Sequence, residues 1–138
     1  MPRNGERGFT LIEILVVLLI IVVLSAIAIP LFVNQRAKAE DAEAKTAAAV
    51  AAGAFEVYHQ DHNTFAGADA QALAEIEPTL AQARGLAVDG TDEGYTLSVE
   101  SASGDAGGGP FTIERTLTGT TRSCASAGDG GCPDSGGW

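Results

Sequence analysis

Residues 9–33 are an apolar segment in which Glu13 is the only charged side chain. As a helix rising about 1.5 Å per residue, this segment would be about 37 Å long, enough to cross a hydrocarbon core of about 30 Å. Residues 1–8 are polar and carry Arg3 and Arg7, which the positive-inside rule keeps on the cytoplasmic face. The sequence therefore predicts one membrane-spanning helix, with the rest of the chain on the outer side of the membrane.

The rest of the 138-residue chain has room for one small domain with a thin core. There are 17 glycines, and large apolar residues are few after residue 33. The formal net charge of −10 argues against nucleic acid as a partner, although a local basic patch remains compatible with it. Ser, His and Asp are present without a nucleophile elbow, a metal signature or a phosphate-binding loop. We therefore expect no enzyme activity and no cofactor.

Residues 34–60 are rich in alanine and charge, which predicts that the helix continues beyond the apolar segment. Arg36 with Glu40, and Asp41 with Lys45, have the i,i+4 spacing that supports a solvated helix. Apolar residues at three- and four-residue steps predict a stripe that packs on the following domain. The predicted stripe consists of Ala47, Val50, Ala51, Ala54, Val57 and Tyr58.

Short helices are predicted after a turn at residues 59–67. Asp69 is expected to cap a helix over residues 70–77, and Pro78 is expected to open a second helix that ends near Gly85.

Alternation of apolar and polar residues then predicts strands. One strand covers residues 95–99, and residues 111–116 and 120–124 are expected to form a hairpin. The Gly-rich residues 101–110 are predicted to be a flexible connection. The fold class is therefore α+β, a long N-terminal helix packed on a small antiparallel sheet.

Cys124 and Cys132 are the two cysteines of the chain and lie close together in the sequence. After an export-like N-terminus, such a pair favours a disulfide formed outside the cytoplasm. The alternatives are two free thiols or half of a zinc site, and His59 and His62 are too distant in the sequence to complete a compact zinc motif. The disulfide, helped by docking of Trp138, is expected to hold the Gly- and Asp-rich tail.

Acidic and histidine clusters are weak candidates for cation sites. Each cluster lacks the full ligand pattern of a known site, and a helix end or a solvated acidic loop explains it equally well. We therefore expect no metal. The clusters are His59, Asp61 and His62 for a transition metal, and Asp89, Asp92 and Glu93, or Asp129 and Asp134, for calcium.

Glu13 is costly in a membrane-spanning segment, by about 2.5 to 3.5 kcal/mol near its centre, so it requires a partner or a function. One turn into the helix, its carboxylate is also able to snorkel to the interface. A cut between Gly8 and Phe9 would expose an α-amine four residues before Glu13. The amine of one subunit would then satisfy the carboxylate of the next, because opposite charges attract strongly when they are desolvated together.

The sequence Gly8-Phe9-Thr10-Leu11-Ile12-Glu13, followed by an apolar run through Pro30, resembles the type IV pilins and the related pseudopilins. The resemblance implies that a membrane prepilin peptidase removes the leader after Gly8 and that Phe9 is N-methylated. It also implies that Glu13 and Pro30 serve assembly. The region from Cys124 to Cys132 looks like the disulfide-bounded region of pilins.

A type IV pilus subunit is thus the main interpretation. The resemblance implies a homo-oligomeric helical filament built by assembly machinery in the inner membrane. The subunit would be a single-pass protein of the cytoplasmic membrane before assembly and part of an extracellular pilus afterwards. The predicted parts are the leader (1–8), the filament-core helix (9–33), the amphipathic half of the helix (34–60) and the globular head (61–138).

Val22 departs from the family pattern, because many members have a glycine there, and the helix is thought to loosen between that glycine and the proline. Pro30 removes one backbone hydrogen bond and crowds the carbonyl of Ala26. A kink or a local loosening is therefore still expected at Pro30, but not the end of the helix.

Three alternatives stay open. Within the family, the chain would be a pseudopilin of a type II secretion or DNA-uptake system, although the terminal disulfide and the alanine-rich connection favour a pilus subunit. Residues 14–24 also resemble a secretory h-region, and Ala26-Ile27-Ala28 resembles a cleavage site that would release a soluble binding module. Glu13 and Pro30 argue against that cut. A plain single-span anchor is the third alternative.

Overall fold

The computed structural model describes residues 8–138, which fall into two units, one up to Val33 and one from Asn34 to Trp138. The predicted leader lies outside the described residues except for Gly8. Helix α1 (Leu11–His62) contributes to both units and continues through Pro30, as expected. In the first unit, α1 contains a stretch that is long and apolar enough to cross a membrane, and none of that stretch is buried.

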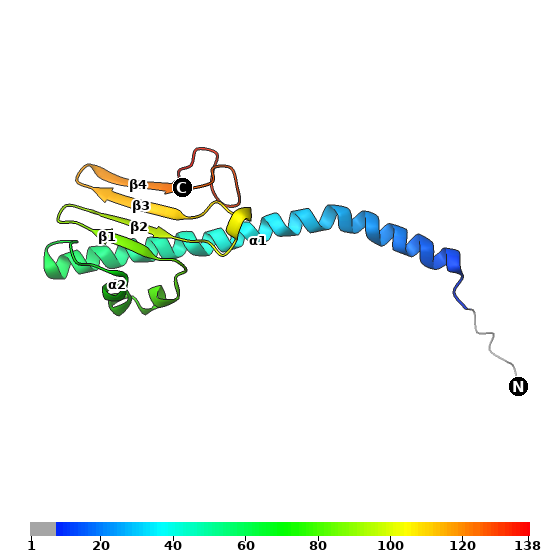
Figure 1. Ribbon diagram of the computed structural model, residues 1–138, viewed down its shortest axis with the longest axis horizontal. Coiled ribbons are helices and arrows are strands. Elements are labelled where there is room, and N and C mark those ends of the chain that lie inside the picture. The colour runs from blue at the N-terminus through cyan, green and yellow to red at the C-terminus, as the bar shows by residue number, and fades with distance from the viewer. Residues whose placement is uncertain (1–7) are drawn as a thin grey trace, which may run out of the picture. The chain divides into compact units, whose positions relative to one another are not determined.

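The second unit packs α1 on a four-stranded antiparallel sheet (Figure 1), which confirms the predicted α+β fold. The strands follow their sequence order across the sheet, from β1 to β4. The predicted strand and hairpin are present with bounds within one residue. The first strand was not predicted, because Val88 is its single large apolar side chain. The strands are β1 (Ala87–Gly90), β2 (Tyr95–Val99), β3 (Phe111–Thr116) and β4 (Gly119–Cys124).

Two short helical elements precede the sheet. Helix α2 (Ala70–Ile76) is capped as predicted, because the Asp69 side chain accepts a hydrogen bond from the Ala72 N–H at 2.8 Å. Pro78 opens a 3-10 helix, η1 (Pro78–Gln82), which is shorter than the predicted helix. A second 3-10 segment, η2 (Gly104–Ala106), lies between β2 and β3.

Helix α1 ends two residues later than predicted. Asn63, with φ of 57°, adopts the left-handed conformation that commonly follows a helix, and its N–H donates to the His59 carbonyl at 2.7 Å. Asparagine tolerates this conformation better than most residues. The predicted turn therefore begins only after His62.

The buried face of α1 differs in phase from the predicted stripe. Ala51 and Ala54 belong to it, whereas Val57 is 43% exposed. The phase was not fixed by the sequence, because alanine occupies so many positions that apolar residues occur on every side of the helix. Phe55 is the large side chain of this face and stacks on Tyr95 with ring centroids 4.2 Å apart. The buried residues of α1 are Ala37, Asp41, Ala44, Ala48, Ala51, Ala54 and Phe55.

Candidate functional site

Glu13 lies in the first turn of α1, where it forms a capping box with Thr10. The Thr10 N–H donates to Glu13 Oε2 at 3.4 Å, and the Glu13 N–H donates to Thr10 Oγ1 at 3.3 Å. This reciprocal pair is the one that a T-x-x-E sequence forms at a helix start, although both distances are long for such bonds. The motif was present in the sequence and was overlooked, because Glu13 was considered only as a charge.

The charge of Glu13 is not neutralised by the described part of the chain. Residues 8–138 form two ion pairs within 4.0 Å, Arg36 with Glu40 at 2.9 Å and Arg115 with Glu56 at 2.7 Å. Glu13 belongs to neither pair. The Thr10 N–H is a neutral donor, so it satisfies one oxygen without balancing the charge. The carboxylate is thus left able to bind a cationic group.

Gly8 and Phe9 precede α1 in a segment without regular secondary structure. Apart from Gly8 itself and its chain neighbours, no atom of the described residues lies within 4 Å of the position that a Cβ on Gly8 would occupy, and Phe9 is 76% exposed. The bond between them is therefore sterically open, and it lies about one helical turn from Glu13.

The first unit exposes apolar side chains on all sides of α1 from Leu11 to Val33. A helix that is apolar all round requires an apolar environment, which a bilayer or the interior of an assembly supplies. Glu13 is the exception in this surface. The arrangement fits a segment that lies either in a bilayer or in the interior of an assembly.

Cys124 and Cys132 form a disulfide with a Cα–Cα distance of 5.9 Å, which confirms the predicted pairing. The tail is also docked as expected. Trp138 Nε1 donates to the Ser123 carbonyl at 2.9 Å, and the indole meets the Phe111 ring edge to face at 5.7 Å.

Asp41 is a buried carboxylate of α1 whose role the sequence analysis missed. It accepts hydrogen bonds from the Gly108 N–H at 2.8 Å, the Gly131 N–H at 2.7 Å and the Ser103 hydroxyl at 2.7 Å. We call Asp41, Ser103, Gly108 and Gly131 the Asp41 clamp. The clamp ties the segment before β3 and the disulfide loop to the same point of α1.

The pKa of Asp41 is lowered in this environment. Burial alone would raise the pKa, but hydrogen bonds from Gly108, Ser101, Gly131 and Ser103 favour the carboxylate and outweigh the burial. Asp41 is therefore ionised in the folded chain.

Lys45, one turn after Asp41, does not form the predicted ion pair with it. Its ammonium donates to the Gly131 carbonyl and lies 5.3 Å from the Phe111 ring centroid and 5.7 Å from that of Trp138. The prediction of a solvated Asp41–Lys45 pair is wrong because both side chains turn toward the C-terminal loops. The other predicted pair, Arg36 with Glu40, is formed.

The glycine-rich segment before β3 is packed, which corrects the expectation of a flexible connection. Gly107 and Gly108 are buried. A Cβ on Gly108 would lie 2.1 Å from Cys132 Cβ. In the disulfide loop, which packs on this segment, a Cβ on Gly130 would lie 2.3 Å from Asp41 Oδ2. Glycine is required here because the backbone approaches both the carboxylate and the disulfide closely.

Three of the side chains considered as cation ligands, His59, His62 and Asp92, have other contacts. His59 stacks on Phe65 with centroids 4.4 Å apart, and His62 stacks on Tyr58 at 4.0 Å. Asp92 accepts from the Thr64 hydroxyl at 2.9 Å. Within residues 8–138, no three His, Cys, Asp or Glu side chains are grouped so that they would hold a metal ion.

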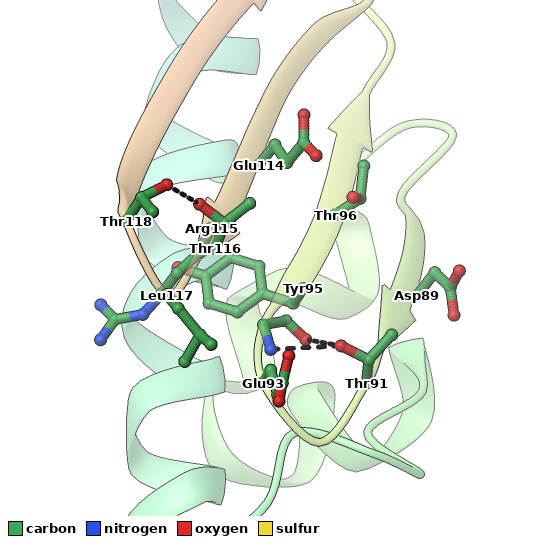
Figure 2. Close-up of a pocket in the computed structure, with 11 residues that line it drawn as sticks. Asp89, Thr91, Glu93, Tyr95, Thr96, Glu114, Arg115, Thr116, Leu117 and Thr118 are labelled. Carbon is green, nitrogen blue, oxygen red and sulfur yellow. Dashed lines mark hydrogen bonds between the residues drawn. The ribbon is translucent and has the colours of Figure 1, made fainter.

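An open pocket lies at one end of the sheet, between the β1–β2 and β3–β4 turns (Figure 2). Its lining includes three carboxylates, those of Asp89, Glu93 and Glu114. In Figure 2, Glu114 and the Arg115 guanidinium lie on opposite sides of β3. Arg115 also lines the pocket, so the three carboxylates share its edge with one cationic side chain.

Comparison with known proteins places the N-terminal segment in a described family of motifs. Residues 3–29 match the prokaryotic N-terminal methylation motif. The chain is 56% identical over 45 residues, 33% of this chain and 20% of the relative, to the type IV major pilin protein PilA of Myxococcus xanthus (strain DK1622). It is 35% identical over 72 residues, 52% of this chain and 47% of the relative, to the fimbrial protein EcpC of Eikenella corrodens.

The chain thus spans less than half of the length of either of these relatives. No solved structure matches it significantly. The resemblance to type IV pilins is confirmed, and the matched motif includes Gly8, Phe9 and Glu13.

Proposed function

Because the chain carries the prokaryotic N-terminal methylation motif, we propose that it is a structural subunit of a type IV pilus. The observation that carries the proposal is the exposed apolar part of α1 with a single carboxylate, Glu13, in its first turn, which forms no ion pair with residues 8–138. In the membrane this surface contacts lipid, and in a filament it contacts the same surface of other copies. The gain on assembly then comes from packing and from charge pairing rather than from leaving water.

Processing supplies the partner of Glu13. Prepilin peptidase cuts between Gly8 and Phe9, and the new Phe9 amine stays positively charged after N-methylation. A cationic amine is a stronger partner for a carboxylate than the neutral Thr10 N–H. Pairing of the Phe9 amine with Glu13 of a neighbouring subunit sets the axial register of the filament, and Pro30 gives α1 a point at which it is able to adjust.

The proposal assigns a location and partners at each stage. Before assembly, the first unit spans the cytoplasmic membrane and the second unit lies outside. Assembly machinery in the inner membrane then moves the subunit into an extracellular filament of identical copies. Motility and adhesion are the activities that such a filament supports.

A pseudopilin of a type II secretion or DNA-uptake system is the competing function, because it would share the same processing and helix packing. Two observations favour a pilus subunit. The relatives named above are a major pilin and a fimbrial protein, and the chain has the disulfide loop held on α1.

Intact mass of the mature protein, together with electron microscopy of surface filaments labelled with antibody to residues 34–138, tests the proposal. We expect a chain that begins at N-methylated Phe9 and filaments that carry the label along their length. A chain that begins at Ile29 would indicate the secreted module, and one that begins at Met1 or Pro2 would indicate a plain anchor. Label confined to the membrane of filament-bearing cells would exclude a pilus subunit.

A further inference from the structure

Strand β4 is the most exposed strand of the sheet, because five of its six residues are exposed. Register partners on the inner face of the sheet are Leu97 of β2, Ile113 of β3 and Arg122 of β4. Leu97 and Ile113 are buried against the helix, whereas Arg122 is exposed. The inner face of the sheet therefore ends in an open surface beside α1.

Cations gather on this open surface. The Arg122 guanidinium lies 5.0 Å from the centroid of the Trp138 ring, and the Lys45 ammonium lies 5.7 Å from the same ring. Arg115 projects from the same face of β3 and pairs with Glu56 at 2.7 Å. In the described chain, Arg122 has no carboxylate within 4.0 Å. Because Glu56 balances the charge of Arg115, we call only Lys45, Arg122 and Trp138 the cationic strip.

The opposite face of the sheet is acidic. Asp89, Thr96 and Glu114 are register partners across β1, β2 and β3, and all three are exposed. Glu93 lines the same pocket as Asp89 and Glu114 (Figure 2). These three carboxylates form no ion pair with any residue from 8 to 138. We call Asp89, Glu93 and Glu114 the acidic face.

The two surfaces differ in sign and lie on opposite sides of one sheet. In a chain of net charge −10, most approaches of one copy to another are repulsive, and the strip is the surface that reverses this. A half-buried tryptophan under an arginine is also the kind of residue pair that anchors protein interfaces. The acidic face of a second copy is therefore the partner that fits the strip.

We propose that the second units of neighbouring subunits contact each other through the cationic strip of one copy and the acidic face of the next. The contact joins two different surfaces, so each bound copy leaves one strip and one acidic face free. Such a heterologous contact extends as an open polymer and does not close into a dimer. The proposal rests on the proposed filament and adds to it a contact outside the helical core.

Charge reversal in the full-length chain tests this contact. The variants are Arg122→Glu, Glu114→Arg and the double exchange, with Arg84→Glu as a matched control, because Arg84 is exposed and belongs to neither surface. Each single reversal replaces attraction by repulsion, and we expect about a tenfold loss of sheared filaments. The double exchange should restore the yield to within about twofold, and the control should match wild type. The membrane pool should be equal in all variants.

Carbodiimide coupling identifies the partner directly. Arg122→Lys keeps the charge and supplies an amine, and in filaments assembled from isotopically mixed subunits we expect an intersubunit bond from this amine to Asp89, Glu93 or Glu114. Normal filament yield from both single reversals would overturn the contact, and so would a bond to any other carboxylate. A double exchange that does not restore the filaments would also overturn the contact. DNA would be the partner of the strip instead if wild type bound a DNA duplex and Arg122→Glu lost that binding while it kept its filaments, and this result too would overturn the contact. Absence of wild-type filaments would instead overturn the proposed function and the contact together.

Discussion

The capping box gives Glu13 a structural role at the helix start that does not depend on its charge. Glutamine forms the same capping contact as glutamate, so charge and cap are separable by substitution. The N-terminal methylation motif, which contains Gly8, Phe9 and Glu13, was recognisable from the sequence because it is local. The proposed pairing of Glu13 with a neighbouring chain is a contact between subunits, so the structure of one chain does not contain it.

Glu13→Gln should therefore assemble poorly although its helix start is intact. The variant keeps a capping side chain and loses the charge that the Phe9 amine requires. Glu13→Leu should also assemble poorly, although removal of a costly charge makes it more stable in the bilayer. Thr10→Ala weakens the cap by about 1 kcal/mol and keeps the charge, so it should assemble nearly normally. The measurement is sheared filaments beside the membrane pool, and normal filaments from Glu13→Leu would exclude an assembly role for Glu13.

The burial of Asp41 and its hydrogen bonds to distant residues were not predicted from the sequence. Lys45 stands four residues away, which offers a simple surface explanation for the charge. The actual partners, Gly108 and Gly131, lie 67 and 90 residues further along the chain. Nothing in a local pattern indicates such distant partners.

Asp41→Asn should lower the free energy of unfolding by about 1 to 3 kcal/mol, because an amide cannot accept all the hydrogen bonds of the clamp. The folded-state pKa of Asp41 lies below its ordinary value, so its contribution is present above the unfolded-state pKa of about 3.9 and is lost as the pH falls through the folded-state pKa. The difference between variant and wild type should therefore shrink in acid below about pH 4. Urea unfolding of the full chain in detergent, followed by Trp138 fluorescence, measures this. Glu43→Gln, an exposed carboxylate on the same helix, is the control, and an equal loss there would contradict a specific clamp.

At the scale of elements, secondary structure was predicted correctly where large apolar side chains alternate with polar ones. Tyr95, Leu97 and Val99 alternate with polar residues and gave β2, and the break before Gly119 gave the hairpin. In α1, alanine offers no such contrast, so the sequence predicted the helix but not the face that it buries. The segment before β3 looked flexible because glycine is equally common in mobile loops and in tightly packed backbone.

Alanine substitutions distinguish a glycine that tight packing requires from a glycine that lies in open space. Gly108→Ala should destabilise the chain by about 1 to 3 kcal/mol, because its Cβ would meet Cys132 at 2.1 Å. Gly53→Ala, in open space on α1, should stabilise it by up to about 1 kcal/mol. Unfolding midpoints that move in the same direction for both variants would contradict the packed segment.

The disulfide loop should contribute about 2 to 3 kcal/mol, the value expected for closing a loop of this length. Comparison of unfolding with and without reductant measures the contribution. Thiol titration of the non-reduced protein should find no free thiol, and two free thiols would contradict the bridge. Bridges between chains would appear as dimers on a non-reducing gel.

At the scale of the whole molecule, charge is divided between the two units. Residues 1–33 contain two arginines and two glutamates, so residues 34–138 carry the entire net charge of −10. This division into an apolar segment and an acidic domain was predictable from the sequence, because composition changes abruptly near residue 33. The sign difference between the two sheet faces was not, since it depends on strand register.

Assembled filaments should therefore repel one another laterally. In low salt they should remain dispersed, and Mg²⁺ or a higher NaCl concentration should bring them into bundles by screening the acidic surface. Light scattering of sheared filaments against salt concentration follows the transition. Bundling that is strongest in low salt would show that the acidic surface is not what keeps filaments apart.

The Asp41 clamp also implies an order of events during maturation. A contact between residues so far apart in the chain is entropically expensive until the intervening sheet has formed, so the clamp should close late in folding. Until then the C-terminal segment remains unattached to α1, and Cys124 and Cys132 are open to the thiol oxidation that takes place outside the cytoplasm. Closure of the clamp afterwards places the loop that the disulfide closes against the helix, so we expect reduced subunits to hold this loop on α1 less firmly.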